Sequence, residues 1–388
     1  AKKHGITFSK PGNGVCHQLQ LENFSKPGET LVGSDSHTPT CGAMGMIAIG
    51  AGGLDVAVAM ATGKYYLQCP SVIQVNLTGQ KAPWVSAKDI ILKVLQELSV
   101  KGGVNKIVEY TGEGIATLSL TDRATICNMG AELGATTSVF PTDKRTLEYL
   151  KQQGRENDYV EMKADADATY DQVLEIDMST LEPMVAKPHS PDAVVPAREL
   201  EGMAINQVVI GSCTNSSFAD MMRAAKILKG RKVAEHVSLV IAPGSSSILA
   251  MLSENGALAD MIQAGARILE CGCGPCIGMG QAPLSKGVSL RTINRNFKGR
   301  SGTNDAGVYL VSPEVAALSA VKGCFSSMFE DDMYLEEVPS TPFIKNANFF
   351  INDYDPYTEV YMGPNIKPVP RGEKLAKNIQ GKMVLKVG

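Results

Sequence analysis

The sequence has few histidines, little excess of charge of either sign and no long uninterrupted apolar run. Its 388 residues include five histidines and carry a formal net charge of -3. Because no basic run is present, the chain lacks the charge pattern of constitutive nucleic-acid binding. Its 44% hydrophobic and 20% charged residues exclude a disordered or fibrous chain and are typical of a globular protein long enough for two or three domains.

Signals for membrane insertion are also missing. The most apolar stretch, residues 41–61, is broken by glycines and carries Asp55, so it is a poor membrane span. We expect it to be a glycine-rich loop that enters a buried helix. The first fourteen residues are polar and have neither an apolar signal core nor an initiator methionine. We therefore expect no membrane partner, and we expect the chain to be a fragment of a longer protein.

Cysteine, in contrast, is plentiful. Nine cysteines, three of them within six positions, fit a reducing compartment and metal binding better than a secreted disulfide framework. This usage predicts the cytoplasm or a mitochondrial-type matrix as the location of the protein.

The clustered thiols lie in residues 270–280, ECGCGPCIGMG. Cys273 and Cys276 are separated by two residues in a stretch too rich in glycine and proline to be a regular helix. Another thiol, Cys213, follows the apolar residues 207–210 and precedes the helix-like residues 218–229. We expect Cys213 near a helix N-terminus, where a thiolate is favoured.

These thiols allow three kinds of site. Four thiolates commonly saturate an iron–sulfur cube, so three would leave one iron open to bind water or substrate. A redox pair is an alternative for Cys273 and Cys276, although Gly272 and Gly274 favour a wrapped loop over the helix start typical of such pairs. A structural zinc site is another alternative, because Cys271 offers a fourth ligand.

A second group of polar residues follows a predicted buried strand at residues 29–33. Asp35, Ser36 and His37 come where the strand ends, and ligands of open α/β sheets bind at that edge. The triplet alone would suit a capping turn equally well. His17 lies a short distance upstream, however, and two imidazoles with a carboxylate can transfer protons near neutral pH. We therefore predict an acid–base site.

A predicted helix at residues 122–133 carries two further candidates. Asn128 and Glu132 are four residues apart and share one helix face, which would be either solvated or, with apolar neighbours, partly buried. A buried Glu132 would need a partner such as His17.

The loop after the predicted strand at residues 289–293 contains Asn294, Arg295 and Arg300. Guanidinium groups form paired hydrogen bonds with carboxylates, so the two arginines suit an acidic substrate. Solvated surface arginines are the more common alternative, but the place of these two after a strand favours a site.

The order of the apolar segments predicts an α/β protein with doubly wound, mostly parallel sheets. Strands are expected at residues 72–77, 207–210, 237–242, 266–269 and 289–293, and helices at residues 86–98 and 218–229 and from residue 247. A proline-rich stretch ending near residue 201 indicates a domain connection.

Four motifs together resemble the aconitase superfamily, over nearly the whole length of the chain. They are GSDSHT at residues 33–38, GSCTN at residues 211–215, CGPC at residues 273–276 and NRNF at residues 294–297.

The resemblance implies a cofactor and a role for each matching residue. Cys213, Cys273 and Cys276 would ligate a 4Fe-4S cluster whose fourth iron takes the substrate, with Cys271 outside the ligand set. The other matches are a catalytic and substrate-binding triplet at Asp35, Ser36 and His37, an acid–base pair at His17 and Glu132, residues near the cluster at Asn128 and Asn294, and carboxylate clamps at Arg295 and Arg300.

The implied activity is that of aconitate hydratase, a hydro-lyase that interconverts citrate and isocitrate through cis-aconitate. The alternatives are an isopropylmalate or homoaconitate dehydratase large subunit and, outside enzymes, an apo-form that binds RNA or a zinc-stabilised structural module. Residues 126–132 and 134–141 look most like aconitase proper.

The resemblance also implies a domain division. Residues 1–70 would complete a first α/β domain, residues 71–190 a second and residues 191–330 a third that carries the cluster cysteines. Residues 331–388 would be an extended linker toward a swivelling domain, supplied in cis or in trans, which holds the catalytic serine base. The N-terminal segment of the single-chain enzymes would also be missing, so we expect the fragment alone to be inactive.

Overall fold

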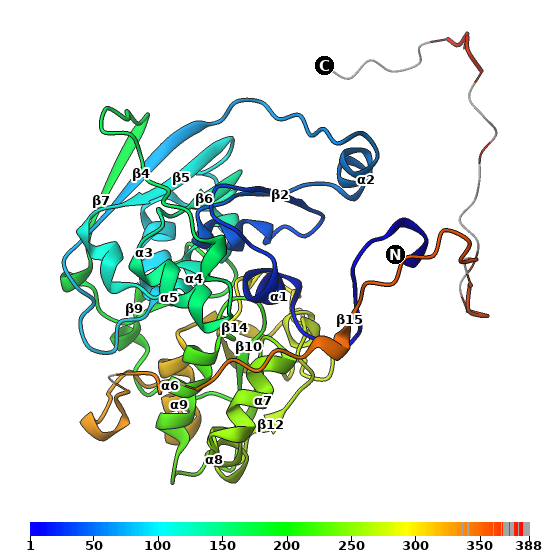
Figure 1. The fold of residues 1–388 in the computed structure, drawn as a ribbon. Coiled ribbons are helices and arrows are strands. Elements are labelled where there is room, and N and C mark those ends of the chain that lie inside the picture. Colours follow the sequence, from blue (N-terminus) through cyan, green and yellow to red (C-terminus); the bar gives the residue numbers. More distant parts are fainter. Residues whose placement is uncertain are drawn as a thin grey trace. The chain divides into compact units, whose positions relative to one another are not determined.

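The computed structural model describes residues 1–335, 337–339, 341–359, 361–365, 367, 372, 376–378 and 380–382. Contacts group the chain into two units, Lys10–Phe349 and a small one made of Ala1–Ser9 with Phe350–Gly388. In the small unit, β1 (Phe8–Ser9) pairs antiparallel with β15 (Phe350–Ile351). The large unit contains three sheets (Figure 1).

One sheet has four parallel strands in the order β6-β5-β4-β7. Its strands are β4 (Ser71–Thr78), β5 (Lys106–Thr111), β6 (Thr137–Val139) and β7 (Gln172–Asp177), and its helices are α3 (Ala87–Leu98), α4 (Leu120–Gly130) and α5 (Lys144–Gln152). The predicted strand at residues 72–77 and helix at residues 86–98 are confirmed. Helix α3 begins where expected because Ser86 and Asp89 form a capping box.

A second sheet has seven strands in the order β12-β11-β10-β13-β14-β8-β9. The first five run parallel, while β8 and β9 are antiparallel additions at one edge. The strands are β8 (Met184–Ala186), β9 (Val194–Pro196), β10 (Gln207–Gly211), β11 (Ser238–Ala242), β12 (Arg267–Ile268), β13 (Val288–Arg291) and β14 (Gly307–Leu310). Every residue of β10 is buried, as its continuous apolar sequence predicts for a central parallel strand.

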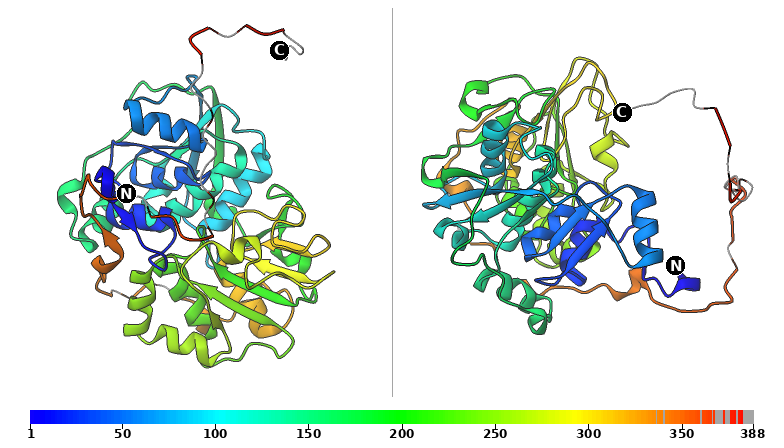
Figure 2. Two further views of the ribbon diagram at one scale, coloured as in Figure 1. Left: turned by 90° about the vertical axis from the view of Figure 1, so that its right-hand side faces the viewer. Right: turned by 90° about the horizontal axis from the view of Figure 1, so that it is seen from above.

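Four helices belong to this second sheet: α6 (Phe218–Leu228), α7 (Ser246–Glu254), α8 (Ala257–Gln263) and α9 (Pro313–Lys322). Helix α9 packs against both β10 and α6. In the left view of Figure 2 the blue-to-cyan segments form the upper half of the large unit and the green-to-yellow segments the lower half. The chain therefore has the mostly parallel α/β sheets that its sequence predicts.

The first segment of the large unit contains α1 (Cys16–Asn23), β2 (Thr30–Gly33), β3 (Ile47–Gly50) and α2 (Gly53–Thr62). Strand β2 confirms the predicted strand but is only half-buried. The expectation of a buried helix within residues 41–61 is wrong: a short 3-10 helix at Thr38–Met44 is fully buried, whereas α2 has no buried residue. Helix α2 lies on the right of Figure 1, away from the two larger sheets, and its Leu54 and Met60 are exposed.

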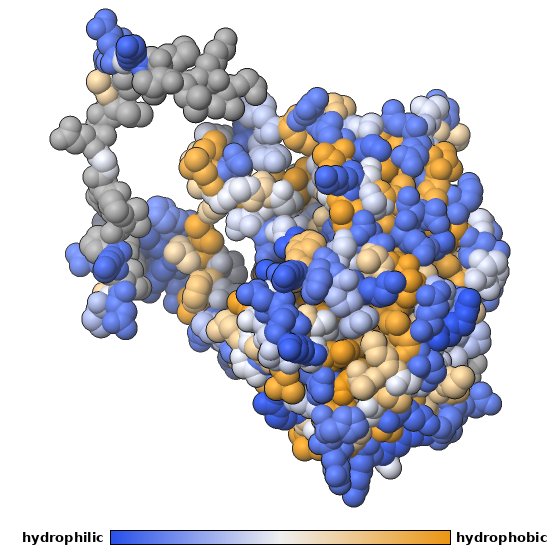
Figure 3. All heavy atoms as spheres, turned by 180° about the vertical axis from the view of Figure 1, so that it is seen from behind, coloured by the Kyte–Doolittle hydropathy of each residue, from blue (hydrophilic) through white to orange (hydrophobic). Residues whose placement is uncertain are grey.

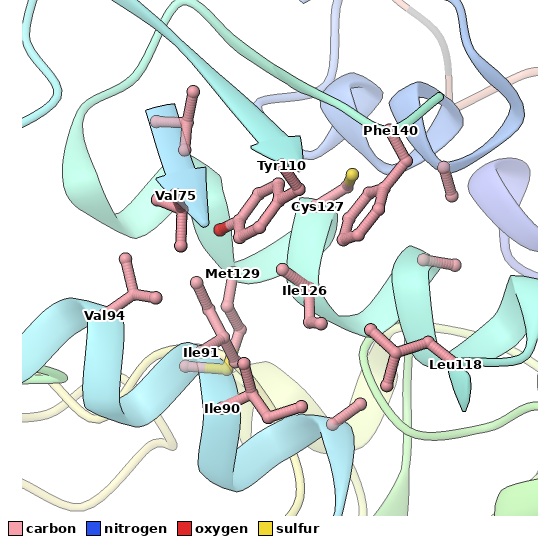
Figure 4. Close-up of a cluster of buried hydrophobic side chains, with 14 of the residues drawn as sticks. Val75, Ile90, Ile91, Val94, Tyr110, Leu118, Ile126, Cys127, Met129 and Phe140 are labelled. Carbon is pink, nitrogen blue, oxygen red and sulfur yellow. The ribbon is translucent and has the colours of Figure 1, made fainter. Parts of the chain in front are cut away.

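The core beneath the four-stranded sheet is built from α3, α4 and the strands above them (Figure 4). Ile90, Ile91 and Val94 of α3 and Ile126 of α4 are fully buried in this core. Nearby, the rings of Tyr110 and Phe140 stack with centroids 4.5 Å apart. The apolar face of α3, read from its helical spacing, is thus the face that fixes it to the sheet.

Hydrophilic side chains are interspersed with apolar ones on the face drawn in Figure 3. Among the residues that the structure describes, no helix is long and apolar enough to cross a membrane.

Residues 10–349 group as one compact unit, which does not reveal the predicted domain boundaries. The three-domain division therefore stays a prediction. The seven-stranded sheet begins at β8, before the predicted boundary at residue 190. Part of the predicted linker at 331–388 lies outside the described residues. Its described part has no α-helix, but Met333 is buried and Tyr334 packs edge-on against Trp84.

Glu22 of α1 is a buried carboxyl group with incomplete hydrogen bonding. Its Oε1 accepts from Gln18 and from Ser245, each at 2.9 Å, while its Oε2 has no partner in the described chain. Burial raises the pKa of Glu22 to about 7, against the opposing effect of these two donors. The folded protein therefore keeps a proton on Glu22 at pH values where the unfolded chain has lost it.

This proton makes folding less favourable as pH rises, because the unfolded carboxyl ionises near 4.5 and the folded one near 7. We predict that Glu22→Gln reduces the loss of stability between pH 5 and pH 8 by on the order of 2–3 kcal/mol. Urea unfolding at both pH values measures this, with the partly exposed Glu148→Gln as control. Equal pH dependence in wild type and Glu22→Gln would contradict the prediction.

Candidate functional site

The predicted site residues follow the carboxyl ends of parallel strands. Residues 34–37 follow β2, residues 212–217 follow β10 and residues 292–296 follow β13, while Asn128 and Glu132 lie at the end of α4. Loops after parallel strands gather at one edge of an α/β structure, which is why motifs far apart in sequence can meet.

Glu132 lies at the centre of one hydrogen-bonded group. It is buried, and its Oε1 accepts from Arg295 Nε at 2.8 Å and pairs with His37 Nε2 at 2.9 Å. Arg295 also donates through Nη2 to Ser36 Oγ at 3.0 Å. The structure thus brings together four of the predicted residues.

The prediction that His17 is the partner of Glu132 is wrong. His17 Nε2 pairs instead with Asp35 Oδ1 at 3.1 Å, and His37 takes the place beside Glu132. The turn after β2 explains the difference: Asp35 Oδ1 also accepts from the backbone N–H of His37 at 2.8 Å. Asp35 Oδ1 thus lies between the two histidines, bonded to Nε2 of His17 and 3.5 Å from Nδ1 of His37, while Nε2 of His37 meets Glu132.

The pair formed by His17 and Asp35 has strongly shifted pKa values. Burial by itself lowers the pKa of His17, but its hydrogen bonds to Asp35 and Cys16 outweigh burial and raise the pKa to about 9. The same contacts with His17 and His37 hold the pKa of Asp35 well below its usual range. The pair formed by His17 and Asp35 is therefore charged at neutral pH.

The acid–base residues lie beside a predicted cluster ligand. The rings of His17 and His37 are 6.2 Å apart, and one donor atom from each lies within 4.8 Å of Cys213 Sγ and of the other. Two imidazoles and a thiol, from α1, the loop after β2 and the loop after β10, thus share one small volume.

Cys213 is surrounded by the two predicted asparagines. Asn294 Nδ2 donates to Cys213 Sγ at 3.2 Å and to Asn128 Oδ1 at 3.0 Å. Asn128 is fully buried and also donates to Thr40 Oγ1 at 3.0 Å. These bonds fix the position of the thiol and give its sulfur an N–H donor.

The other two predicted ligands lie at a short 3-10 helix, Gly274–Ile277, with Cys273 exposed and Cys276 buried. Arg300 Nη2 contacts Cys276 Sγ at 3.6 Å. Burial, then the nearby thiols of Cys273 and Cys276, raise the pKa of Cys213 to about 12, so the three thiols lie in one neighbourhood. After burial, the groups that raise the pKa of Cys271 to about 11 are Glu22 and Glu270, and not another thiol.

These residues fit a 4Fe-4S cluster. Three thiols lie in one neighbourhood, and two of their sulfurs have nitrogen donors, from Asn294 and from Arg300, of the kind that tune cluster sulfurs. The surroundings of Cys271 do not favour the alternative of a four-thiol zinc site. One guanidinium atom, Arg300 Nε, is buried without a partner in the described chain and could bind an anion.

Lys88 is a site residue that the sequence analysis missed. Its side chain is fully buried, and Nζ donates to the carbonyl oxygens of Thr292 (2.9 Å) and Ile293 (2.7 Å) and to Asn215 Oδ1 (3.3 Å). Burial lowers the pKa of Lys88 to about 7, although nearby acidic groups oppose this. The amine ties the loop of Cys213 to the loop of Asn294. A lysine within an apolar helical stretch was the only sequence signal.

Comparison with known proteins agrees with this geometry. A model of the aconitase family (aconitate hydratase) matches residues 1–323. The 3-isopropylmalate dehydratase large subunit 2 of Archaeoglobus fulgidus is 44% identical over 324 residues, 83% of this chain and 78% of that protein. The homoaconitase large subunit of Methanocaldococcus jannaschii is 41% identical over 339 residues, 85% of this chain and 80% of that protein.

The mitochondrial aconitate hydratase of Schizosaccharomyces pombe is 40% identical over 415 residues, which cover 97% of this chain and 52% of that protein. The relatives named here are thus enzymes that add or remove water. The chain belongs to the aconitase family, and the predicted family resemblance and hydro-lyase class are confirmed.

Lys88 provides a test of how the two loops are held. We predict that Lys88→Met lowers the free energy of unfolding by at least about 2 kcal/mol, because two buried carbonyls lose their donor. It should also reduce the cluster content of anaerobically reconstituted protein, because the Cys213 and Asn294 loops lose their link.

Ile91→Ala is the matched control, since Ile91 is equally buried on α3 but lies in the apolar core. It should cost about 2–5 kcal/mol of stability and leave the cluster content of the folded fraction unchanged. Iron and sulfide analysis beside urea unfolding separates the two effects. Equal cluster content in both variants would show that Lys88 does not position the site.

Proposed function

We propose that this chain is the cluster-bearing part of a dehydratase that reversibly removes water from a small hydroxy-polycarboxylate. The observation that carries the proposal is the convergence of His17, His37 and Cys213 donor atoms within 4.8 Å. Acid–base groups that lie against a metal-ligating thiol suit a reaction in which a proton and a hydroxide leave neighbouring carbons.

Cys213, Cys273 and Cys276 are the residues that would hold a 4Fe-4S cluster. When bound, its open iron would supply a Lewis acid that makes hydroxide a tolerable leaving group. Asn294 and Arg300 would donate to the ligand sulfurs, at the contacts described above.

Arg295 and Arg300 are suited to bind the carboxylates of the substrate. Arg295 is held in place by Glu132 and Ser36, so its fork is oriented before a substrate arrives. Arg300 has the unpaired buried Nε, which gives it a donor to spare. A substrate carboxylate bound by the two guanidinium groups would exchange its hydrogen bonds with water for hydrogen bonds with donors that are already held in place.

Two pairs of groups can hold or transfer protons. His37 Nε2 shares a proton with Glu132 Oε1, and His17 Nε2 shares one with Asp35 Oδ1. The roles differ: the pair of His17 with Asp35 is charged and partly open to solvent, which suits it to orient a substrate hydroxyl. His37 and Glu132 are both buried, which suits them to pass a proton to the departing hydroxide.

The relatives favour the alternative substrates over citrate. The 3-isopropylmalate dehydratase and homoaconitase large subunits each match this chain over about four fifths of their own length. We therefore propose a substrate of the isopropylmalate or homoaconitate type. Aconitate hydratase stays a second candidate, because the relative of that name matches 97% of this chain.

Two of the relatives are named large subunits, which supports a need for a further subunit or swivelling domain. Removing a proton from carbon requires a base on the face of the substrate opposite the iron. The resemblance assigns that base to the swivelling domain. We propose that the chain alone binds a cluster but does not turn over substrate.

The ligand set gives the first prediction from this proposal. Cys213→Ser, Cys273→Ser and Cys276→Ser should each abolish the visible absorbance of a reconstituted cluster, whereas Cys271→Ser should keep it. Anaerobic reconstitution followed by absorbance, iron and sulfide measurement checks this. A cluster that survives in one of the first three variants, or is lost in the fourth, means that a ligand is misassigned.

The proposed substrate gives the second prediction. With a small subunit or swivelling domain supplied in trans, 3-isopropylmalate, homoaconitate and citrate should react at different rates, and the carbon skeleton used fastest identifies the enzyme. Arg295→Lys should lower kcat/KM at least about 100-fold, because an ammonium cannot form the paired contacts. Turnover by the chain alone would place the base within residues 1–388, with His17 and His37 the first to test.

A further inference from the structure

Cys16 is a thiol that the proposed function does not use, and it lies beside His17 and Asp35. Cys16 Sγ is 3.7 Å from His17 Nδ1 and 3.9 Å from His17 Nε2, and His17 Nε2 is 3.1 Å from Asp35 Oδ1. One ligand atom from each of the three residues lies within 4.8 Å of the others. The group therefore presents sulfur, nitrogen and oxygen donors to one point.

The spacing of these atoms suits a tetrahedral metal ion. With Zn–S near 2.3 Å and Zn–N or Zn–O near 2.0–2.1 Å, tetrahedral angles place S and N about 3.6 Å apart and N and O about 3.3 Å apart. The measured 3.9 Å and 3.1 Å differ from these values by only a few tenths of an ångström. Asp35 already lies beside Nε2 of His17, but the sulfur of Cys16 is about as close to Nδ1 as to Nε2, so the exposed Cys16 side chain must rotate to bring its sulfur to the Nε2 side of the ring.

The charges and the exposure of the three side chains also favour a metal ion. A thiolate and a carboxylate balance a divalent cation, and the imidazole of His17, once the ion has displaced its proton, completes a mixed donor set that favours zinc over an all-oxygen ion such as magnesium. Cys16 and Asp35 are exposed while His17 is buried, so an ion can arrive from solvent and keep a water ligand. The backbone N–H of His37 holds Asp35 Oδ1 in position at 2.8 Å before any ion binds.

We propose that Cys16, His17 and Asp35 form a binding site for Zn²⁺ or a similarly thiophilic divalent cation, separate in its ligands from Cys213, Cys273 and Cys276. An ion at this site takes His17 and Asp35 away from the substrate. The bound ion therefore inhibits the enzyme reversibly. Binding of the ion needs only the three side chains, whereas the inhibition rests on the proposed function.

Cobalt titration tests the binding step. The host is the chain with Cys213, Cys273 and Cys276 all replaced by serine, which removes the other converging thiols, and far-UV circular dichroism checks its fold. We expect one Co²⁺ per chain with a thiolate-to-cobalt charge-transfer band. Cys16→Ser in this host should remove the band and weaken binding by more than about 100-fold, beyond the effect of losing an outer-shell partner.

Cys69→Ser is the matched control, because Cys69 is also exposed but contacts only the carbonyl oxygen of Pro70. It should leave the band unchanged. A band that persists in Cys16→Ser, or is lost in Cys69→Ser, overturns the site.

A second measurement does not depend on the triple variant. Cluster-bearing chain, dialysed against Zn²⁺, should retain one zinc more than its Cys16→Ser counterpart by metal analysis, and equal zinc content overturns the proposal. With the further subunit present, Zn²⁺ should inhibit wild type at concentrations at least about tenfold lower than Cys16→Ser, each measured against its own zinc-free rate. Zinc binding without measurable turnover would contradict the proposed function and leave the metal site standing.

Discussion

The carboxylate of Glu132 is the contact on which the arrangement of the site depends. It receives His37 and Arg295 at less than 3 Å, and through Arg295 it is connected to Ser36. These residues come from the end of α4, from the loop after β2 and from the loop after β13. A buried carboxylate must be satisfied by donors, so this single acceptor requires three distant chain segments to meet.

Lys88 also connects loops of the site, through a buried amine where Glu132 uses a buried carboxylate. Its buried amine needs acceptors, and it finds them in the backbone of the β13 loop and in Asn215 of the β10 loop. The buried carboxylate and the buried amine thus share the β13 loop, which Glu132 connects to the β2 loop and Lys88 to the β10 loop. Burying these groups costs desolvation free energy, but their hydrogen bonds favour a single arrangement of the loops. A site that must position reacting groups needs such a fixed arrangement.

Much of the fold could be predicted because its signals are local. Helix α3 has an apolar face and a capping box, and β10 is a short continuous apolar run. Strands with weaker signals were not predicted, such as β6, β8 and β9, which have three residues each. Their pairing with other strands decides their conformation. Helix α2 was expected to be buried because its sequence is apolar, but burial depends on whether another element covers it.

The sequence by itself determined where the candidate site residues lie: the cysteine loop, the triplet after β2 and the arginines after β13 all follow strands, and strand ends can be read from apolar runs. Only the tertiary structure decided how these residues pair. His37 rather than His17 meets Glu132, although both are histidines of the same early segment. His17 lies on α1 and pairs with Asp35, whereas His37 follows β2 and reaches the carboxylate after α4. Partners 95 residues apart leave no periodic trace in the sequence, since their contact depends on how whole segments pack.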